Sequence, residues 1–344
     1  MSKGWLLRGR KGCYTGMEMS YSIEVEGFPS LEERWQELLQ ARPRGNIFLT
    51  PQWQKAWWQE FGAGRESLLL SVRRGAELVG IAPLMRQGDT ISFIGDNDVC
   101  DCMDFIACQG QESAFSAVLL DYLEAMKWHS LDLHCLLPYS IALSHFAPLA
   151  RERGYRVEIT TEAVSPQVVL PRSWEEYLSQ LGAKDRHELR RKLRRLSQAG
   201  SAYYYTVDDR DRLPQDLEDF FRLFKQSGSD KTEFMTSQRE GFFKAMAHSL
   251  AEKGYLRLSF LEVEGVRVAT ALCLDYGNEL YLYNSGYDPA YSSLSVGLLL
   301  KVFCLKEGII MGRRRFDFLR GAEDYKYNLG GQDVPVHRCL VSRR

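Results

Sequence analysis

The sequence lacks an excess of charge of either sign, a long apolar run and any metal-binding spacing of cysteine and histidine. Its 344 residues carry 44 Lys and Arg against 45 Asp and Glu, which gives a net charge of −1. This balance provides no global field for nucleic acid or a membrane surface, so an anion site on this chain must be local. The composition, 45% hydrophobic and 26% charged, is typical of a globular protein, and the length predicts about two domains.

A membrane span and a metal site are not expected. The best apolar stretch, residues 298–311, is interrupted by Lys301 and Lys306 and falls short of the roughly 18 residues that a span needs. The eight cysteines form no C-x-x-C pair and the six histidines no H-E-x-x-H motif, so we expect no metal and reduced thiols in a cytoplasmic protein. The first apolar segment is too short for a signal peptide. We therefore expect residues 1–19 to be a disordered extension, with Met17 or Met19 as an alternative start.

Two similar groups of three predicted strands stand in the two halves of the chain. The first comprises residues 68–74, 76–85 and 90–95, and the second comprises residues 255–264, 266–276 and 279–287, each broken by short Gly turns. Corresponding turns, at Gly75 and Gly265 and at Gly88 and Gly277, lie 190 and 189 residues apart. Because the register holds across two turns, the pattern predicts a duplicated unit.

The segments around each group of strands also correspond. Predicted helices precede the strands at residues 51–61, 213–225 and 238–253, and a longer helix follows at residues 112–127 and 294–311. Each longer helix leads to one more strand, at residues 131–136 and 314–319. This order predicts two α/β domains, residues 20–165 and 166–344, each with a mixed sheet whose last two strands are parallel.

The order of elements resembles the GNAT acyltransferase fold, and two such units in tandem resemble the Fem-type peptidyltransferases and the acetyltransferases related to the cellulose-biosynthesis protein CelD. The resemblance rests most on LYNSGYDPAYSSLSVGLLL (282–300), RRFDFLRGAEDYKYNLG (314–330) and LGAKDRHELRRKLRRL (181–196), with FLTPQWQKAWW (48–58) in the first half. It covers residues 47–330 and is strongest from residue 178 onward. It implies two tandem GNAT-like domains, with the donor site in the second.

A predicted helix start follows Pro289 and is a candidate anion site. Its serines are suitable N-caps, and the N–H groups of a helix start bind phosphate well. The resemblance places the pyrophosphate of coenzyme A here, although only one glycine of the family loop, Gly297, is present. The alternative is a capped helix without a ligand. The candidate donor-binding residues are Ser292, Ser293, Ser295, Val296 and Gly297.

The stretch 314–330 is the candidate catalytic segment. Asp317 stands in an apolar strand, so it must be functional or paired with Arg320 or a nearby lysine. Acyl transfer to an amine needs a base, an acid and donors for the oxyanion. Asp317 or Glu323 is a candidate base, Tyr325 a candidate acid, and Lys326 a cation whose position resembles one with a substrate-anion role in Fem-type relatives. The backbone N–H groups expected to complete the oxyanion site belong to Asn284, Ser285 and Gly286.

The predicted helix at 184–195 has seven basic residues against two acidic ones. Its arginines are candidates for contacts with the 3′-phosphate of coenzyme A, a transfer RNA backbone or an anionic lipid-linked substrate; the alternative is a solvated face. In the first half, Asp101 and Asp104 follow the third strand, where the second half has its candidate anion site. These two acids are candidates to face an amine acceptor in a cleft between the halves. The candidate substrate-binding residues are Arg186, Arg190, Arg194, Asp101, Asp104, Tyr281, Tyr283 and Arg320.

The residues and the resemblance together predict an N-acyltransferase. It would move an acyl group, by expectation acetyl, from a CoA thioester to an amine on a sugar, peptide or cell-envelope precursor, as in polysaccharide biosynthesis. Acetyl-CoA or another acyl-CoA is the expected donor, with no metal and no DNA partner, and peripheral membrane association stays open. One alternative is a Fem-type peptidyltransferase that uses aminoacyl-tRNA; the other is a non-catalytic binding module.

Overall fold

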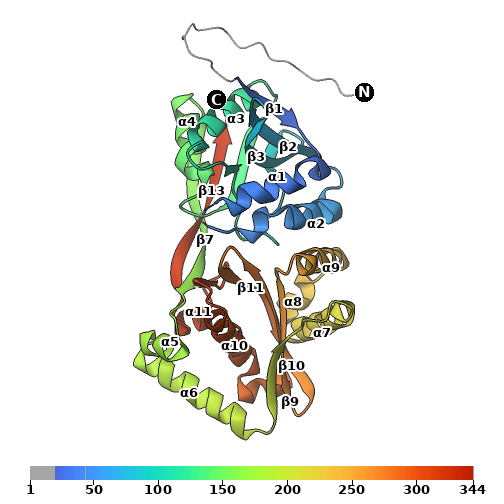
Figure 1. The fold of residues 1–344 in the computed structure, drawn as a ribbon, viewed down its shortest axis with the longest axis vertical. Coiled ribbons are helices and arrows are strands. Elements are labelled where there is room, and N and C mark those ends of the chain that lie inside the picture. The colour runs from blue at the N-terminus through green and yellow to red at the C-terminus, as the bar shows by residue number, and fades with distance from the viewer. Residues whose placement is uncertain (1–19, 43, 344) are drawn as a thin grey trace.

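The computed structural model describes residues 20–42 and 44–343, so the predictions about residues 1–19 lie outside the described part of the chain. Figure 1 shows two α/β halves joined along one sheet. The sheet has 13 strands in the order β1-β2-β3-β4-β6-β13-β7-β12-β11-β10-β9-β8, with β5 beside β3. Mixed pairing within it confirms the predicted α/β class.

The first half contains, in chain order, β1 (Tyr21–Val25), α1 (Phe28–Gln40), η1 (Ile47–Leu49), α2 (Pro51–Phe61), β2 (Glu66–Arg74), β3 (Glu77–Gln87), β4 (Thr90–Phe93), β5 (Ile106–Ala107), α3 (Glu112–Glu124), β6 (Ser130–Leu136), η2 (Ala142–Phe146), α4 (Ala147–Glu152) and β7 (Arg156–Val169).

The second half contains α5 (Trp174–Gln180), α6 (Ala183–Gln198), β8 (Ala202–Thr206), α7 (Leu213–Gln226), α8 (Ser229–Phe234), α9 (Ser237–Glu252), β9 (Leu256–Val263), β10 (Val266–Tyr276), β11 (Glu279–Tyr287), η3 (Pro289–Leu294), α10 (Val296–Ile310), β12 (Arg315–Asp317), α11 (Asp324–Asn328) and β13 (Gln332–Ser342).

Both predicted groups of three strands are present as antiparallel meanders. Strands β2, β3 and β4 pair in sequence, as do β9, β10 and β11. The turn between β10 and β11 places Gly277 and Asn278 at φ angles of 60° and 62°, the left-handed pair that a tight hairpin needs. Each meander is followed by a helix and a parallel strand, β6 beside β4 and β12 beside β11.

Two strands join the halves. Strand β7 pairs with β12 near Val168, and β13, the last strand, returns to pair with β7 and β6. The division at residue 165 therefore falls inside β7, and β13 lies in the sheet of the first half although it follows the second half in sequence. The assignment of two domains stays a proposal, with these two strands shared between them.

Separate helices cover the two faces of the second-half sheet. Helices α7 and α9 pack on the face that bears Tyr281 and Tyr283, in a core that continues into the first half. Helices α5, α6 and α10 pack on the opposite face, against Leu280 and Leu282. Gly286 permits this packing, because a Cβ there would collide with the backbone of Phe224 in α7. The site described next lies where the strands between these layers separate.

Candidate functional site

Strands β11 and β12 part after a short paired stretch. They are hydrogen-bonded in register only from Glu279 opposite Arg315 to Tyr281 opposite Asp317. Beyond Tyr281, β11 continues for six residues with β10 on one side, and no β12 residue is paired with it on the other. This leaves an open strand edge that starts beside Asp317.

The direction of each backbone group on β11 follows from one hydrogen bond. The N–H of Asp288 donates to the carbonyl of Val268 at 2.8 Å, so this opposed pair is a hydrogen-bonded pair. Because such pairs alternate along an antiparallel ladder, Gly286 and Asn284 also point toward β10. Ser285 and Tyr287 therefore direct their N–H and C=O groups toward the open edge.

The expectation of oxyanion donors from three consecutive residues is corrected by this register. The backbone N–H and C=O groups of Asn284 and Gly286 point toward β10, and Gly286 is also needed for the close approach of α7. Ser285 alone of the three presents its N–H to the open edge.

A lysine that sequence reasoning missed lies at this edge. The ammonium of Lys231, in α8, donates to the carbonyl of Ser285 at 2.6 Å and lies 5.0 Å from the centre of the Phe224 ring. Burial lowers the pKa of Lys231, and the nearby Asp230 and Glu323 oppose that shift. A partly desolvated positive charge therefore stands beside the free N–H of Ser285.

The predicted helix start is present at α10, and the anion site in front of it stays a proposal. Ser295 adopts a left-handed conformation with φ of 57° and makes no side-chain cap. Within the described residues, the N–H groups of Val296 and Gly297 have no recorded hydrogen-bond partner, as expected at a helix start. The pocket in front of them has a volume of about 260 Å³ and is lined by Lys192, Tyr287, Ser292, Ser295, Val296, Gly297, Leu298, Lys301 and Tyr325.

Gly297 has a different role from the one expected. It was predicted to let a ligand approach the backbone, but a Cβ at this position would lie 2.8 Å from the ring of Tyr287. The missing side chain therefore makes room for this tyrosine, which packs against α10.

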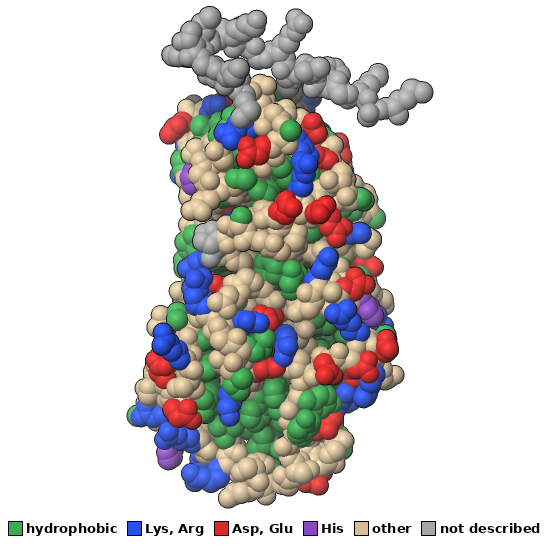
Figure 2. Space-filling view, in the orientation of Figure 1, with side chains coloured by type: hydrophobic (Ala, Val, Ile, Leu, Met, Phe, Trp, Pro, Cys, Tyr) green, Lys and Arg blue, Asp and Glu red, His purple; other side chains and the backbone are tan. Residues whose placement is uncertain are grey.

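The basic helix reaches the anion site through residues other than those expected. Lys192 donates to the hydroxyl of Ser295 at 3.1 Å, and Arg195 donates to the carbonyl of Ser293 at 2.8 Å. Arg190 and Arg194 each stand two positions from Lys192, which places them on the other side of the helix. Both are exposed. Lys and Arg side chains gather over α6 at the lower left of Figure 2.

The third predicted arginine of this helix is structural. Arg186 donates to the carbonyls of Leu178, Ser179 and Leu181 at 3.2–3.4 Å, and so satisfies the end of α5. The predicted face of three arginines is therefore not the surface that contacts the anion site.

Asp317 is buried and has neutral partners. Its carboxylate accepts from the hydroxyl of Ser165 and the amide of Gln167, each at 2.8 Å, and from the N–H of Leu319. The expectation that Arg320 or a lysine pairs with it is wrong, because Arg320 pairs with Asp101. Burial, with Glu279 and Asp101 nearby, raises the pKa of Asp317 to about 7.

The three candidate residues that follow β12, Glu323, Tyr325 and Lys326, differ in their surroundings. Lys326 is buried and donates to the carbonyls of residues 319, 320 and 321 at 2.7–3.1 Å, so its ammonium holds the turn together rather than remaining free for an anion. Glu323 is 57% exposed at its side chain and lies 3.0 Å from Lys326. Tyr325 lines the anion pocket, where burial raises its pKa.

Lys301 adds a second buried amine to this pocket. Its ammonium donates to the carbonyl of Gly297 at 3.0 Å and lies 4.8 Å from the centre of the Tyr325 ring. Burial, reinforced by the charge of Lys231, lowers the pKa of Lys301 to about 8. At neutral pH the pocket therefore carries positive charge from the lysines of α6 and α10.

A cleft of about 680 Å³ lies between the two halves. Asp104, Glu279 and Asp317 line it, together with Tyr139, Tyr281 and four arginines, Arg42, Arg44, Arg314 and Arg315. Arg44 lies 4.2 Å from the ring centre of Tyr139 and has no ion pair within the described residues. Asp317 therefore borders a cleft whose wall carries side chains of both charges.

Of the two predicted cleft acids, Asp101 joins the halves, whereas Asp104 is paired within the first half. Asp104 lines the cleft but is 4% exposed, pairs with Arg42 at 3.1 Å and accepts from the N–H groups of Ile141 and Ala142. Burial nevertheless raises its pKa. Asp101 pairs with Arg320 and is not among the residues that line the cleft.

The two predicted cleft tyrosines also bridge the halves. The hydroxyl of Tyr281 donates to the carbonyl of Gly45 at 3.0 Å, and that of Tyr283 donates to the carbonyl of Val99 at 2.9 Å. Both rings are buried, which raises the pKa of both tyrosines. Tyr281 lines the cleft, whereas Tyr283 lies in the aromatic core.

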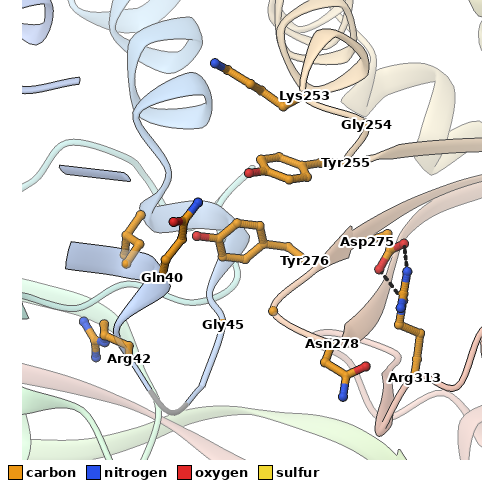
Figure 3. A pocket seen from close by; sticks show the side chains of 12 residues that line it. Gln40, Arg42, Gly45, Lys253, Gly254, Tyr255, Asp275, Tyr276, Asn278 and Arg313 are labelled. Atoms are coloured by element: carbon orange, nitrogen blue, oxygen red, sulfur yellow. Dashed lines mark hydrogen bonds and ion pairs between the residues drawn. The ribbon is translucent and has the colours of Figure 1, made fainter. Parts of the chain in front are cut away.

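A second, shallower pocket of about 450 Å³ lies at the same junction, and Figure 3 shows it from close by. Tyr255 and Tyr276 meet edge to face at its centre, and Asp275 pairs with Arg313 through two contacts of 2.7 Å. Gly45 and Gly277 touch at its edge, since a Cβ on Gly45 would lie 2.6 Å from Gly277 Cα. This pocket therefore marks a close backbone contact between the halves.

The corresponding separation in the first half is filled only in part by the chain itself, and a pocket of about 200 Å³ remains beside β4 and β6. Strands β4 and β6 pair only at Thr90–Ser130 and Ile91–Leu131. Beyond them the N–H of Met103 donates to the carbonyl of Cys135, and Cys100 and Met103 are buried there. Of the two separations, the one beside β11 is therefore the more open along its strand edge.

Sequence reasoning missed Lys192, Arg195, Lys231 and Lys301. Lys192 and Arg195 belong to the basic helix predicted at 184–195, but its sequence alone does not show which side of the helix packs against the rest of the protein. Lys231 stands on a six-residue helix with no motif, and Lys301 was noted only as an interruption of an apolar run. Within residues 20–42 and 44–343, no cluster of three metal-ligating side chains and no helix long and apolar enough to cross a membrane is found.

Comparisons with known proteins agree with this architecture. Residues 183–327 match the model of an acetyltransferase (GNAT) domain. FemX matches with a TM-score of 0.67 and 12% identity, over 92% of this chain and 96% of that one. A conserved protein of unknown function from Bacteroides thetaiotaomicron matches with 0.61 and 12%, over 94% and 100%. L-PGS from Bacillus licheniformis matches with 0.56 and 11%, over 90% and 91%. No curated protein matches the chain.

Proposed function

We propose that this protein, whose fold is a mixed α/β fold of tandem GNAT type, is an N-acyltransferase that uses an acyl-CoA, by expectation acetyl-CoA. The observation that carries the proposal is the open edge of β11 leading to the N–H groups at the start of α10 for which the described residues provide no hydrogen-bond partner. An acyl thioester on a phosphorylated carrier needs both a strand edge for its amides and an anion site for its phosphates.

The donor phosphates would bind at the start of α10. The N–H groups of Val296 and Gly297, the helix dipole and the ammonium of Lys192 all favour an anion there. From this position the carrier arm would follow Tyr287 and Ser285 along β11 toward Asp317. The donor would therefore be held by the start of α10, the ammonium of Lys192 and the open edge of β11, rather than by a glycine-rich loop.

The acceptor amine would enter from the cleft between the halves. Asp317 lines that cleft and stands where the strands separate, so it can take a proton from an amine that approaches the acyl carbon. A carboxylate whose pKa is near 7 is better matched to this proton transfer than one with an ordinary pKa. Tyr325 is the remaining candidate acid on the donor side.

The acceptor class follows the sequence expectation: an amine on a sugar, peptide or cell-envelope precursor, as in CelD-like or polysaccharide acetylation, in the cytoplasm. The seven described cysteines, all free thiols, are consistent with a reducing compartment. No metal takes part in the proposed transfer.

A second candidate is a Fem-type peptidyltransferase that takes its acyl group from aminoacyl-tRNA. Two observations favour it: the full-length likeness to FemX and the exposed basic row along α6, which includes Arg190 and Arg194. A transfer RNA backbone would use the outer side of α6, whereas the phosphates of coenzyme A need only the side that faces Ser295.

Calorimetric titration of acetyl-CoA tests the proposal. We expect micromolar binding by the wild type, about tenfold or greater loss in Lys192→Glu, and a change within twofold in Arg190→Glu, a matched charge reversal on the other side of α6. Loss in both variants, with a steep salt dependence for a charged tRNA, would favour the peptidyltransferase. No binding of either donor would favour a non-catalytic module.

A further inference from the structure

Among the described residues, Lys231 is the lysine whose ammonium is hydrogen-bonded to the open edge of β11, and it is partly buried. It comes from α8, a short helix between α7 and α9, and reaches the carbonyl of Ser285 at 2.6 Å. The register of β10 and β11 directs this carbonyl, and the N–H of the same residue, away from the ladder. The lysine therefore acts on the edge along which an acyl donor would lie.

The ammonium of Lys231 lies beside an aromatic ring and a backbone carbonyl rather than beside a carboxylate. Its ammonium lies 5.0 Å from the Phe224 ring centre, and no ion pair within 4.0 Å is recorded for it among the described residues. The nearest acidic influences are Asp230 and Glu323, the second of which lies 3.0 Å from Lys326. Two of its three protons thus remain available for another acceptor.

Lys326 cannot supply the positive charge that acyl transfer needs. Its ammonium has three backbone carbonyls and Glu323 within 3.1 Å, so each of its protons already has an acceptor. Tyr325 remains neutral, because burial raises its pKa. A cation for the reacting carbonyl must therefore come from another residue.

We propose that the ammonium of Lys231 and the N–H of Ser285 together form the oxyanion site for the acyl carbonyl. The inference rests on the proposed function and names a group that the sequence patterns did not indicate. Both donors lie on one edge of one strand, and the ammonium is already held there by the carbonyl of Ser285.

The step balances as follows. The acceptor nitrogen forms a bond to the acyl carbon, and the π pair of the carbonyl moves to oxygen, where Lys231 and Ser285 donate hydrogen bonds. The proton that the nitrogen loses passes through water to Asp317, which is paired with Tyr281, four residues before Ser285 on β11. The carbonyl then re-forms, the C–S bond breaks with its electron pair on sulfur, and the thiolate takes a proton from Tyr325, which solvent then reprotonates.

The test compares Lys231→Met with Lys231→Arg and with a matched control, Lys244→Met. Lys244 also lies over an aromatic ring, at 5.5 Å from that of Phe221, and forms an ion pair, but it stands on α9 away from the open edge. Thiol release from acetyl-CoA, with water as the acceptor, measures the rate. We expect kcat to fall about a hundredfold in Lys231→Met, to recover largely in Lys231→Arg, and to be unchanged in Lys244→Met.

A binding measurement separates this role from a structural one. S-carboxymethyl-CoA places a negative oxygen near the position of the acyl carbonyl, whereas acetyl-CoA does not. We expect the wild type to prefer the charged analogue about tenfold and Lys231→Met to lose this preference while still binding acetyl-CoA.

The outcomes distinguish the two proposals. If Lys231→Met keeps both the rate and the preference, the oxyanion site is refuted and the acyltransferase proposal stands. If the wild type binds neither CoA derivative, the CoA donor fails, and the role of Lys231 fails with it.

Discussion

The replacement Asp317→Asn is expected to stabilise the protein at alkaline pH while it removes activity. Asp317 is 4% exposed and its hydrogen bonds come from neutral groups, so nothing compensates a full negative charge there. Burial raises its pKa from 3.8 to about 7. Each pKa unit corresponds to about 1.4 kcal/mol, so ionising this buried group costs up to about 4 kcal/mol of folding free energy.

The sign of the pH dependence follows from the raised pKa. Below the unfolded pKa of 3.8, both states are protonated and the group contributes nothing. Between that value and about 7 the unfolded chain ionises first, so the free energy of unfolding falls as the pH rises, and it levels off above 7. Asparagine cannot ionise, and Gln167 can turn its amide to accept from the new NH₂ group, so the variant avoids this loss.

Denaturant unfolding at pH 5 and pH 8 measures the effect. The difference in unfolding free energy between Asp317→Asn and wild type should increase by about 3 kcal/mol from the lower to the higher pH. Acyl transfer should fall at least a hundredfold in the variant at pH 8 and by much less at pH 5, where the wild-type carboxyl is already protonated. A difference in stability that does not change with pH would show that Asp317 titrates normally, and would refute its role as a base matched to neutral pH.

Three further substitutions test the fold around the site. His134 lies between two carboxylates, which raise its pKa to about 9. The stabilisation from the protonated ring is therefore complete below the ordinary pKa of 6.5 and is lost as the pH rises through 9. In denaturant titrations the difference in unfolding free energy between wild type and His134→Gln should close between pH 7 and pH 10. Lys326→Met should lower the unfolding free energy by about 3 kcal/mol by leaving backbone carbonyls unpaired, and an equal effect of Lys253→Met in thermal melting would contradict this. Gly286→Ala should cost about 2 kcal/mol or more through its clash with α7, whereas Gly27→Ala, whose Cβ would lie 3.6 Å from a proline Cδ, should cost less than 1 kcal/mol; similar melting temperatures for the two variants would contradict the close contact.

Much of the fold was predictable because short sequence patterns indicate its strands and turns. Short Gly turns between strands rich in β-branched and aromatic residues located both meanders, and the repeated spacing of those turns identified the duplication. The return of β13 to the first half was not predictable, because a terminal strand carries no local signal for the sheet edge that it will join.

The candidate site was predictable only in part. The helix start was predictable from the proline and serines around it, although Ser295 makes no side-chain cap, and Asp317 was conspicuous as a lone carboxylate in an apolar strand. The roles of Gly297, Lys326 and Arg320 differ from those expected because each depends on a contact with a distant segment or on a turn that only the folded chain forms. Lys231 had no motif at all, since its position is set by how α8 packs beside β11.

Hydrogen–deuterium exchange upon addition of acetyl-CoA tests the central claim most directly. The open backbone N–H groups of Ser285, Tyr287, Val296 and Gly297 should exchange more slowly in the complex, because the donor would take their hydrogen bonds. Peptides from the partly filled separation in the first half, residues 91–105, should be unchanged. Protection confined to the first half, or none on β11 and α10, would contradict the placement of the donor on the open edge of β11.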